Sequence, residues 1–317
     1  MLYLIRDETT EVSTCGYRCT ATTRKTYLYE VNVIAKWRDS AWKTIICDIP
    51  QRAIEYLMPD LSADMNPAGK IKGMPGVELF AKGTDTDIGM REPDVFFNIP
   101  MLNKESGNVA LFVEQQEEHS DELPRKVFDV FVRVREEWRQ PTTCIVIYTG
   151  DKSQNVNTYV ESCYGFKVTV EFRTYYLPIK SADELRADSR PFARVMLAAR
   201  LAMDIGNSRE LRNKYAAEMV EITAGDEERK FILDFTRRIF QLDDYEISED
   251  VKEVYRMQTM ELEEYRKQVY LQCAREEGIE EGLEKAAYLM MARGMPLLEV
   301  AETLGLPAER LQQLQPH

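Results

Sequence analysis

The chain has 317 residues, of which 44% are apolar, and a formal net charge of −13 at pH 7. Such a length can bury a large core and hold more than one structural unit, whereas the acidic balance disfavours bulk attraction to nucleic acid, which depends largely on lysine and arginine. No run reaches the roughly 18 apolar residues of a membrane span, and the first residues lack the order of a secretory signal. We therefore expect a cytoplasmic protein with no membrane partner.

The cysteines and histidines exclude several kinds of site. Six cysteines are scattered along the chain, and only Cys15 and Cys19 are close together, so we expect reduced thiols rather than a four-ligand zinc site or a disulfide framework. The two histidines, His119 and His317, leave no room for a His-rich metal cluster, and we interpret His119 as a solvated loop residue. The chain has neither a Walker loop nor a GxGxxG motif. Hydrolysis by carboxylates and a divalent cation is one of the few hydrolytic mechanisms that the sequence still allows.

The first 90 residues are predicted to form an extension, a helix and a loop. Residues 1–38 carry no recognisable chemistry, and the alternation over residues 27–35 predicts a strand in an extension that packs on the core. Apolar residues at helical spacing predict a helix over residues 39–61, which Pro50 divides into two pieces. Residues 62–90 are rich in Gly, Pro and Asp and are predicted to form a loop or an irregular strand.

Residues 92–118 contain two apolar runs on either side of a polar turn at residues 103–108, a pattern typical of a β-hairpin. The first run carries Asp94 near its start, and the second carries Glu114 and Gln116 near its end. Antiparallel pairing brings the start of one strand beside the end of the next, and side chains at i and i+2 share a face. We therefore expect Asp94 to meet Glu114, with Gln116 alongside.

Two carboxylates that meet at this point suit one hard divalent cation. The alternative is that two acids on an exposed rim face each other by chance. The continuous apolar run over residues 109–113 favours the cation, because it predicts a strand covered on both faces. An unpaired charge at the end of a buried strand is costly, so the acids there need a partner.

Residues 122–139 predict an amphipathic helix whose apolar side faces the core. Its other side is basic, and Arg125 and Lys126 adjoin the candidate site; a merely solvated helix face is the alternative. Further strands are predicted at residues 142–148 and 166–177, with a polar loop over residues 151–158. A helix that bridges two strands of one sheet makes them parallel, so we expect residues 109–116 and 142–148 to pair in parallel.

Strand patterns disappear after residue 181. Helical periodicity defines a helical region over residues 181–275 and a small helical unit over residues 276–317, with expected helices at residues 191–204, 208–223, 227–242, 249–277, 284–293, 297–304 and 307–314. The mixed charges of residues 261–284 fit either a coiled-coil arm or a single exposed helix. Residues 297–311 have helix-turn-helix spacing, but the second helix has too little positive charge to read DNA. We therefore favour packing or dimerisation.

The ordered set of motifs resembles a known nuclease family. Pro93-Asp94, a hairpin and Glu114-x-Gln116 resemble the PD-(D/E)xK motif in the variant where Gln replaces Lys. Residues 39–43, 116–126, 147–150, 277–282 and 292–306 are similar, in the same order, to segments of the recombination-promoting nuclease family (Rpn, or YhgA-like), which also carries a transposase label. The resemblance covers roughly residues 39–180 and 270–315. Gln115 departs from the His of that family, and its downstream Arg matches either Arg125 or Lys126.

The resemblance implies an α/β fold, with a restriction-endonuclease-like mixed sheet core flanked by helices over residues 39–180 and an all-helical region after it. It also implies Mg²⁺-dependent cleavage of double-stranded DNA linked to recombination or transposition, with Mn²⁺ as an alternative ion. Asp94 and Glu114 would hold the cation, Gln116 would orient the attacking water, and Arg125 or Lys126 would contact DNA and offset charge.

The superfamily likeness adds a further candidate, an acid on the first helix near the cation. Asp39 and Glu55 are the two acids in question, and the alternative for each is an ordinary surface position. The rival function is a catalytically inactive nuclease-fold protein that oligomerises or binds a partner through its C-terminal helices.

Overall fold

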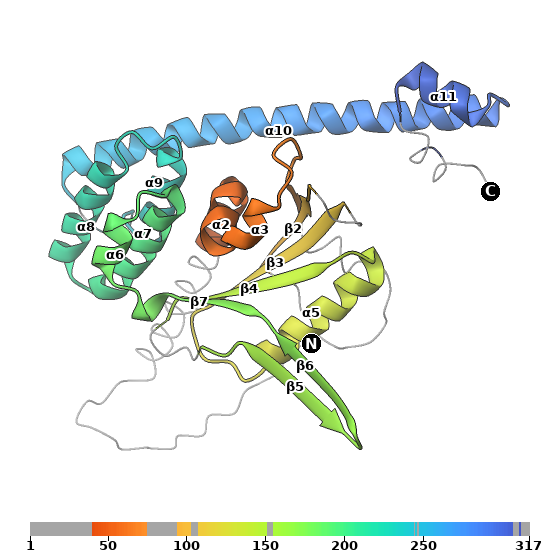
Figure 1. The fold of residues 1–317 in the computed structure, drawn as a ribbon. Coiled ribbons are helices and arrows are strands. Elements are labelled where there is room, and N and C mark those ends of the chain that lie inside the picture. Colours follow the sequence, from red (N-terminus) through yellow and green to blue (C-terminus); the bar gives the residue numbers. More distant parts are fainter. Residues whose placement is uncertain are drawn as a thin grey trace, which may run out of the picture.

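The computed structural model describes residues 40–74, 94–102, 107–150, 155–243, 245, 247–306 and 311. Within this part of the chain, a five-stranded mixed sheet lies between helices, and a helical region follows that ends in one long helix (Figure 1). The mixed α/β class predicted from the sequence is confirmed. The predicted strand over residues 27–35 lies outside the described residues, as do residues 75–93 and the turn at residues 103–106.

The sheet has the strand order β1-β2-β3-β4-β7, with antiparallel pairing up to β3 and parallel pairing after it. Its strands are β1 Lys72–Met74, β2 Val95–Pro100, β3 Asn108–Gln116, β4 Thr142–Tyr148 and β7 Arg173–Tyr176. The predicted hairpin is confirmed by the β2–β3 register. The predicted parallel pairing is confirmed as well, because helix α5 (Leu123–Trp138) carries the chain from the end of β3 back to the start of β4.

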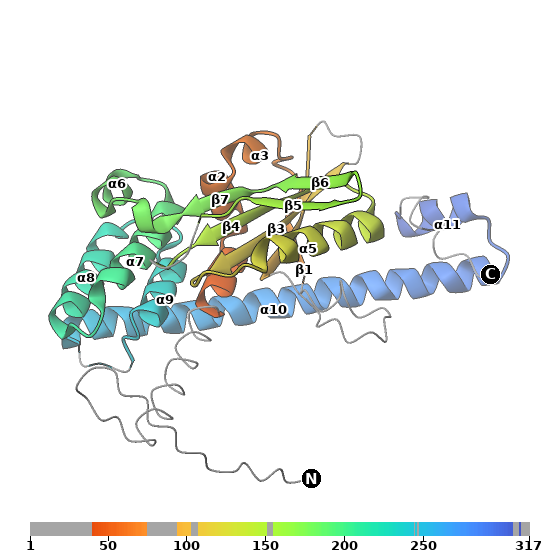
Figure 2. The ribbon, with the colours of Figure 1, turned by 90° about the horizontal axis from the view of Figure 1, so that it is seen from below.

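Strand β3 is buried on both faces, which explains its continuous apolar run. Val109, Leu111 and Val113 face a core shared with the N-terminal helices and with the helical region. Ala110 and Phe112 face the opposite core, which α5 covers with its own apolar side. Figure 1 shows α5 on one side of the sheet and α2 (Pro50–Leu57) and α3 (Pro59–Ala63) on the other, and Figure 2, seen from below, shows α5 running over the strands. Even-numbered positions of β3 therefore point toward α5.

The N-terminal helices are divided by two prolines rather than one. A helix covers residues 40–48, followed by α2 (Pro50–Leu57) and α3 (Pro59–Ala63). Proline fits the first turn of a helix, where its missing N–H is not needed, but it cannot continue the preceding helix. The split predicted at Pro50 is confirmed, and Pro59 adds a second break.

The strand predicted over residues 166–177 is wrong in extent, because it is two strands separated by Phe172, and a further strand before it was not predicted. β5 (Thr158–Cys163) and β6 (Phe166–Glu171) form a separate antiparallel pair, and only β7 joins the main sheet. The pair turns at Tyr164 and Gly165, which have φ values of 45° and 88°, as two-residue hairpin turns require. Phe172 ends the pair by entering the core. Alternation alone does not reveal which sheet a strand joins.

The helical region comprises η1 Leu177–Ile179, α6 Ala182–Ala187, α7 Pro191–Ile205, α8 Arg209–Ile222, α9 Arg229–Ile239, α10 Glu249–Ala292 and α11 Leu297–Leu304. The helices predicted over residues 191–204, 208–223, 227–242 and 297–304 are confirmed, η1 and α6 were not predicted, and one prediction needs correction. The two helices predicted at residues 249–277 and 284–293 are one continuous helix of 44 residues. Gly278 and Gly282 lie inside it, because a helical glycine costs only about 1 kcal/mol. α10 also runs through residue 276, where a separate unit was expected to begin.

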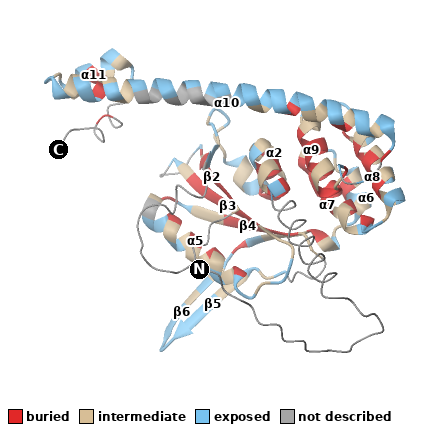
Figure 3. Ribbon diagram, turned by 180° about the vertical axis from the view of Figure 1, so that it is seen from behind, coloured by how far each residue is buried: buried red, intermediate tan, exposed pale blue. Residues whose placement is uncertain are grey.

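The first half of helix α10 packs against the rest of the helical region, and its second half projects past the body of the protein (Figures 1 and 3). Leu262 is fully buried, and Arg266 donates to Asp48 at 2.6 Å and to Asp234 at 3.3 Å. α11 folds back onto the far end of α10, where Ala287 is buried. The predicted helix at residues 307–314 lies outside the described residues except for Leu311. None of the described helices has the length and apolar character needed to cross a membrane.

Candidate functional site

The structure brings Asp94 and Glu114 together at one end of the sheet. Asp94 directly precedes β2, whose first residue, Val95, pairs with Val113 of β3. Continuing that register by one step sets Asp94 opposite Glu114. The Oδ2 atom of Asp94 accepts a hydrogen bond of 2.7 Å from the backbone N–H of Gln115, which holds the carboxylate against the end of β3. The two acids therefore share the face of the sheet that α5 covers.

Glu114 is a buried acid, and only one of its two carboxylate oxygens accepts a hydrogen bond from the residues that the structure describes. Its side chain is 2% exposed, and its Oε2 accepts a 2.6 Å hydrogen bond from the Nζ of Lys126, in the first turns of α5. Its Oε1 is buried and has no hydrogen-bond partner within the described part of the chain. Buried polar atoms usually have a partner, so this oxygen has the capacity to accept a hydrogen bond or to bind a cation.

The surroundings of Glu114 shift its ionisation toward neutral pH. Burial raises its pKa to about 7, the ammonium of Lys126 opposes this shift, and the negative charge of Asp94 adds to it. Burial penalises the ionised form because the carboxylate loses its water. The group is therefore poised between its two protonation states near pH 7, and a cation bound here would favour the ionised state.

Lys43, on the helix over residues 40–48, is the site residue that the sequence analysis missed. Its Nζ lies 3.4 Å from the Oδ1 of Asp94, so each acid of the pair has a lysine beside it. The only sequence signal for Lys43 was the resemblance of residues 39–43 to the nuclease family's opening motif, and that resemblance did not show which residue Lys43 contacts. Two acids from this region were candidates for a position near the cation. Glu55 instead accepts hydrogen bonds from Gln51 and Arg52 on α2, and Asp39 lies outside the described residues.

The two glutamines after Glu114 point to opposite faces of the sheet. Gln116 shares the face of Glu114, and its amide donates to the carbonyl oxygen of Glu118 rather than to a carboxylate. Gln115 faces the other core, and its amide donates to the Thr149 hydroxyl at 2.6 Å. The strand ends meet closely here, since a Cβ on Gly150 would lie 1.8 Å from the Glu117 carbonyl oxygen.

Arg125 and Lys126 are neighbours in sequence but have different surroundings. Lys126 bonds Glu114, whereas Arg125 is exposed and lies close enough to Tyr159 of β5 to influence its hydroxyl electrostatically. His119 pairs with Asp121 at 2.8 Å in the loop before α5, as expected of a solvated loop residue. The lysine is therefore the residue of this pair that belongs to the carboxylate cluster.

The donor atoms suit a hard cation better than a soft one. Within the described residues, no group of three or more His, Cys, Asp or Glu side chains gathers around one point, so the acids at 94 and 114 would be the only acidic ligands there. Mg²⁺ is commonly bound by one or two carboxylates and keeps several waters. The unpartnered Oε1 of Glu114 is one such ligand atom, so the residues present fit Mg²⁺.

No model of a known protein family matches the chain, and no curated protein or solved structure matches it either. The likeness to the PD-(D/E)xK nucleases therefore remains a resemblance of motifs.

Proposed function

We propose that this protein is a Mg²⁺-dependent endonuclease that hydrolyses phosphodiester bonds of double-stranded DNA. The observation that carries this proposal is the pairing of Asp94 with the buried Glu114, whose Oε1 has no partner among the described residues. The element order also supports a restriction-endonuclease-like core: a helix, three antiparallel strands, a crossing helix and a parallel strand. The motif resemblance adds a link to recombination or transposition.

Each polar residue of the cluster has a distinct part in this chemistry. Asp94 and Glu114 would hold Mg²⁺, which would supply Lewis acidity toward a phosphate oxygen and lower the pKa of a bound water. Lys43 and Lys126 each place an ammonium group beside one of these carboxylates. From these positions the two ammonium groups would stabilise the negative charge that develops on the phosphate. Gln116 orients the attacking water, and it provides no positive charge of its own.

A plasmid-nicking assay tests the proposal. With Mg²⁺, the wild type converts supercoiled plasmid to nicked circles, and Asp94→Asn or Glu114→Gln lowers the rate by about 100-fold or more, since even partners of metal ligands matter by 10- to 100-fold. Asp204→Asn and Glu253→Gln are matched controls, because both acids lie on exposed helix faces in ion pairs with Arg200 and Arg256. Nicking that persists in both site variants would contradict the assignment.

A second candidate function is that of a catalytically inactive nuclease-fold protein that binds itself or a partner through its C-terminal helices. Two observations favour it: each acid of the pair already has a lysine beside it, and the far half of α10 exposes several large apolar side chains, namely Val269, Leu271, Ile279, Tyr288 and Leu289. The absence of nicking with both Mg²⁺ and Mn²⁺, together with a stable dimer in light scattering, would select this function.

A further inference from the structure

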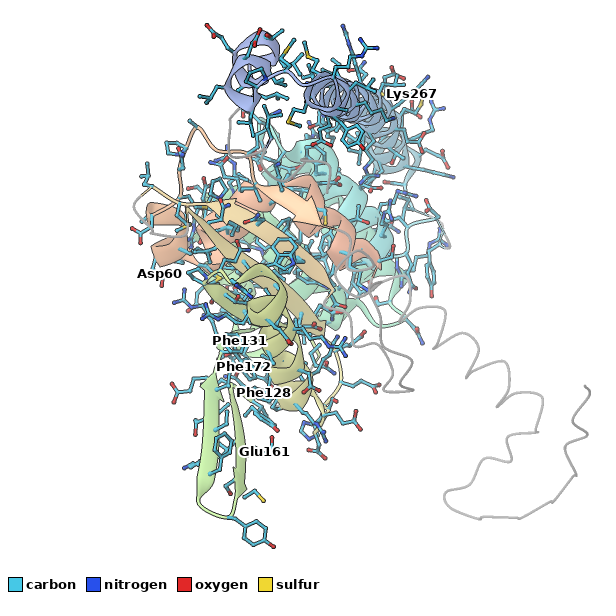
Figure 4. The ribbon with its side chains drawn as sticks, turned by 90° about the vertical axis from the view of Figure 1, so that its right-hand side faces the viewer. Asp60, Phe128, Phe131, Glu161, Phe172 and Lys267 are labelled. Carbon is cyan, nitrogen blue, oxygen red and sulfur yellow. The ribbon has the colours of Figure 1, made fainter. Side chains whose placement is uncertain are left out.

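The β5–β6 pair projects from the body of the protein as a two-stranded ribbon, defined by residues 158–171. It forms its own sheet, with pairs from Thr158↔Glu171 to Cys163↔Phe166. Figures 1 and 4 show it leaving the sheet beside α5, and Figure 3 shows its surface as largely exposed. An isolated two-stranded hairpin is marginally stable in water, so its persistence here requires support along one side.

One face of the ribbon receives that support from α5. Tyr159 stacks on Phe128 of α5, with ring centroids 4.9 Å apart and planes 16° from parallel. Val168 and Val170, on the same face, are half-buried. The backbone N–H of Phe172 donates to the Asn157 carbonyl at 2.9 Å and closes the base. The supported face is therefore tied to the helix that also carries Lys126.

The opposite face of the ribbon is exposed and carries side chains that form hydrogen bonds. Ser162 is paired with Lys167, and Val160 with Thr169, so these four exposed residues lie together on it, and the Thr158–Glu171 pair continues the same face at the base. Strands rise about 3.4 Å per residue and lie about 5 Å apart, which makes the ribbon roughly 20 Å long. Such a face has the dimensions and chemistry of a reading surface rather than of a core.

We propose that this ribbon enters the major groove of duplex DNA and reads base edges through Ser162, Lys167 and Thr169. This inference rests on the proposed function. The major groove is about 12 Å wide and admits a two-stranded ribbon. Lysine suits the acceptors of guanine, and serine and threonine hydroxyls suit either donors or acceptors. The exposed Val160 offers an apolar contact for a thymine methyl group.

The ribbon adjoins the candidate cleavage site through α5. Phe128, which supports the ribbon, follows Lys126 by two residues. The exposed Arg125 lies near the base of the ribbon, by Tyr159, where it would neutralise a phosphate and set the position of the duplex. Of the ribbon's two acids, Glu161 accepts a hydrogen bond from the Tyr159 hydroxyl on the supported face. Glu171 is exposed at the base of the reading face, opposite Thr158 and away from the tip that carries Ser162 and Lys167. A duplex on the reading face would thus lie against the helix that also carries Lys126.

The test uses the full chain and a randomised duplex DNA library in EDTA, so that binding is measured without cleavage. Repeated selection with the wild type should enrich a sequence motif. On that duplex, Lys167→Ala should weaken binding by about 10-fold, the effect of losing one good base contact, and should flatten the preference at one position. Lys267→Ala is the matched control, because Lys267 is also exposed and lies at the opposite end of the molecule (Figure 4).

Three results would overturn the reading face: no enriched motif, equal binding by the Lys167 and Lys267 variants, or ribbon variants that change only self-association in light scattering. The last would make the ribbon a contact for another protein chain. Failure of the nuclease proposal looks different. DNA binding that depends on the ribbon, without Mg²⁺-dependent nicking, would refute the endonuclease proposal and support the reading face. Nicking that is unchanged in the ribbon variants would support the endonuclease and refute the reading face.

Discussion

Burial of Glu114 makes the stability of the protein depend on pH, and the substitution Glu114→Gln removes that dependence. The side chain is 2% exposed, and burial raises its pKa from 4.5 to about 7. Between these values the folded protein holds a proton that the unfolded chain releases. The stabilisation is therefore complete below about pH 4.5 and is lost as the pH rises through 7.

The size of the effect follows from the two pKa values. At 1.36 kcal/mol for each pKa unit, the full loss is about 3 kcal/mol, and about 2.5 kcal/mol of it falls between pH 5 and pH 8. Glutamine has nearly the same shape and does not ionise. We expect the wild type to lose about 2.5 kcal/mol relative to Glu114→Gln over that range, because only the wild type must hold a charged carboxylate away from water.

Urea unfolding followed by circular dichroism measures this difference, at four pH values from 5 to 8 and in EDTA. Groups that titrate equally in both proteins cancel when the two free energies of unfolding are subtracted. Glu253→Gln is the control, since Glu253 is an exposed glutamate paired with Arg256, and its difference from wild type should stay level. Parallel curves for wild type and Glu114→Gln would refute the reasoning, because they would show that the carboxyl group does not titrate in this range.

Further predictions concern the cation, the strand ends and the attachment of α10. Mg²⁺ at pH 8 should raise the thermal midpoint of the wild type but not that of Asp94→Ala. At a Mg²⁺ concentration 100 times the dissociation constant, the expected gain in the free energy of unfolding is about 2.7 kcal/mol. Gly150→Ala should lower the free energy of unfolding in urea by about 2–3 kcal/mol, because the new Cβ would lie 1.8 Å from the Glu117 carbonyl oxygen. Asp234→Ala should cost about 2–3 kcal/mol in the same assay, because it leaves three partly exposed arginines, including Arg266, without their shared partner. A nicking rate that falls rather than rises from pH 6 to pH 8 would contradict a role for ionised Glu114.

The sheet core was predictable because its signals are local. The apolar run over residues 109–113 indicates a strand covered on both sides, and the amphipathic pattern of α5 indicates a helix that covers one of them. A strand, a covering helix and another strand can be joined within one sheet essentially in one way, which led to the parallel pairing. The meeting of Asp94 with Glu114 followed from the antiparallel hairpin in the same manner.

The ribbon and α10 were not predictable in full, for a common reason. Alternation over residues 158–171 is the same whether a strand joins the main sheet or forms a free pair, and the choice depends on where Phe172 finds a core. A helix end was predicted at residue 277, but each of the glycines at 278 and 282 costs only about 1 kcal/mol, and α10 continues through both.

The amino-acid sequence by itself determined the strands of the core, the helix that crosses it and the two acids that meet at its end, because short-range periodicity and pairing rules carry that information. Only the tertiary structure decided which basic side chains join those acids. Lys43 and Lys126 lie 51 and 12 positions from Asp94 and Glu114 along the chain, and their approach depends on how two separate helices are rotated and docked against the sheet. No local pattern records such a rotation, since it is set by packing among residues distant in the sequence.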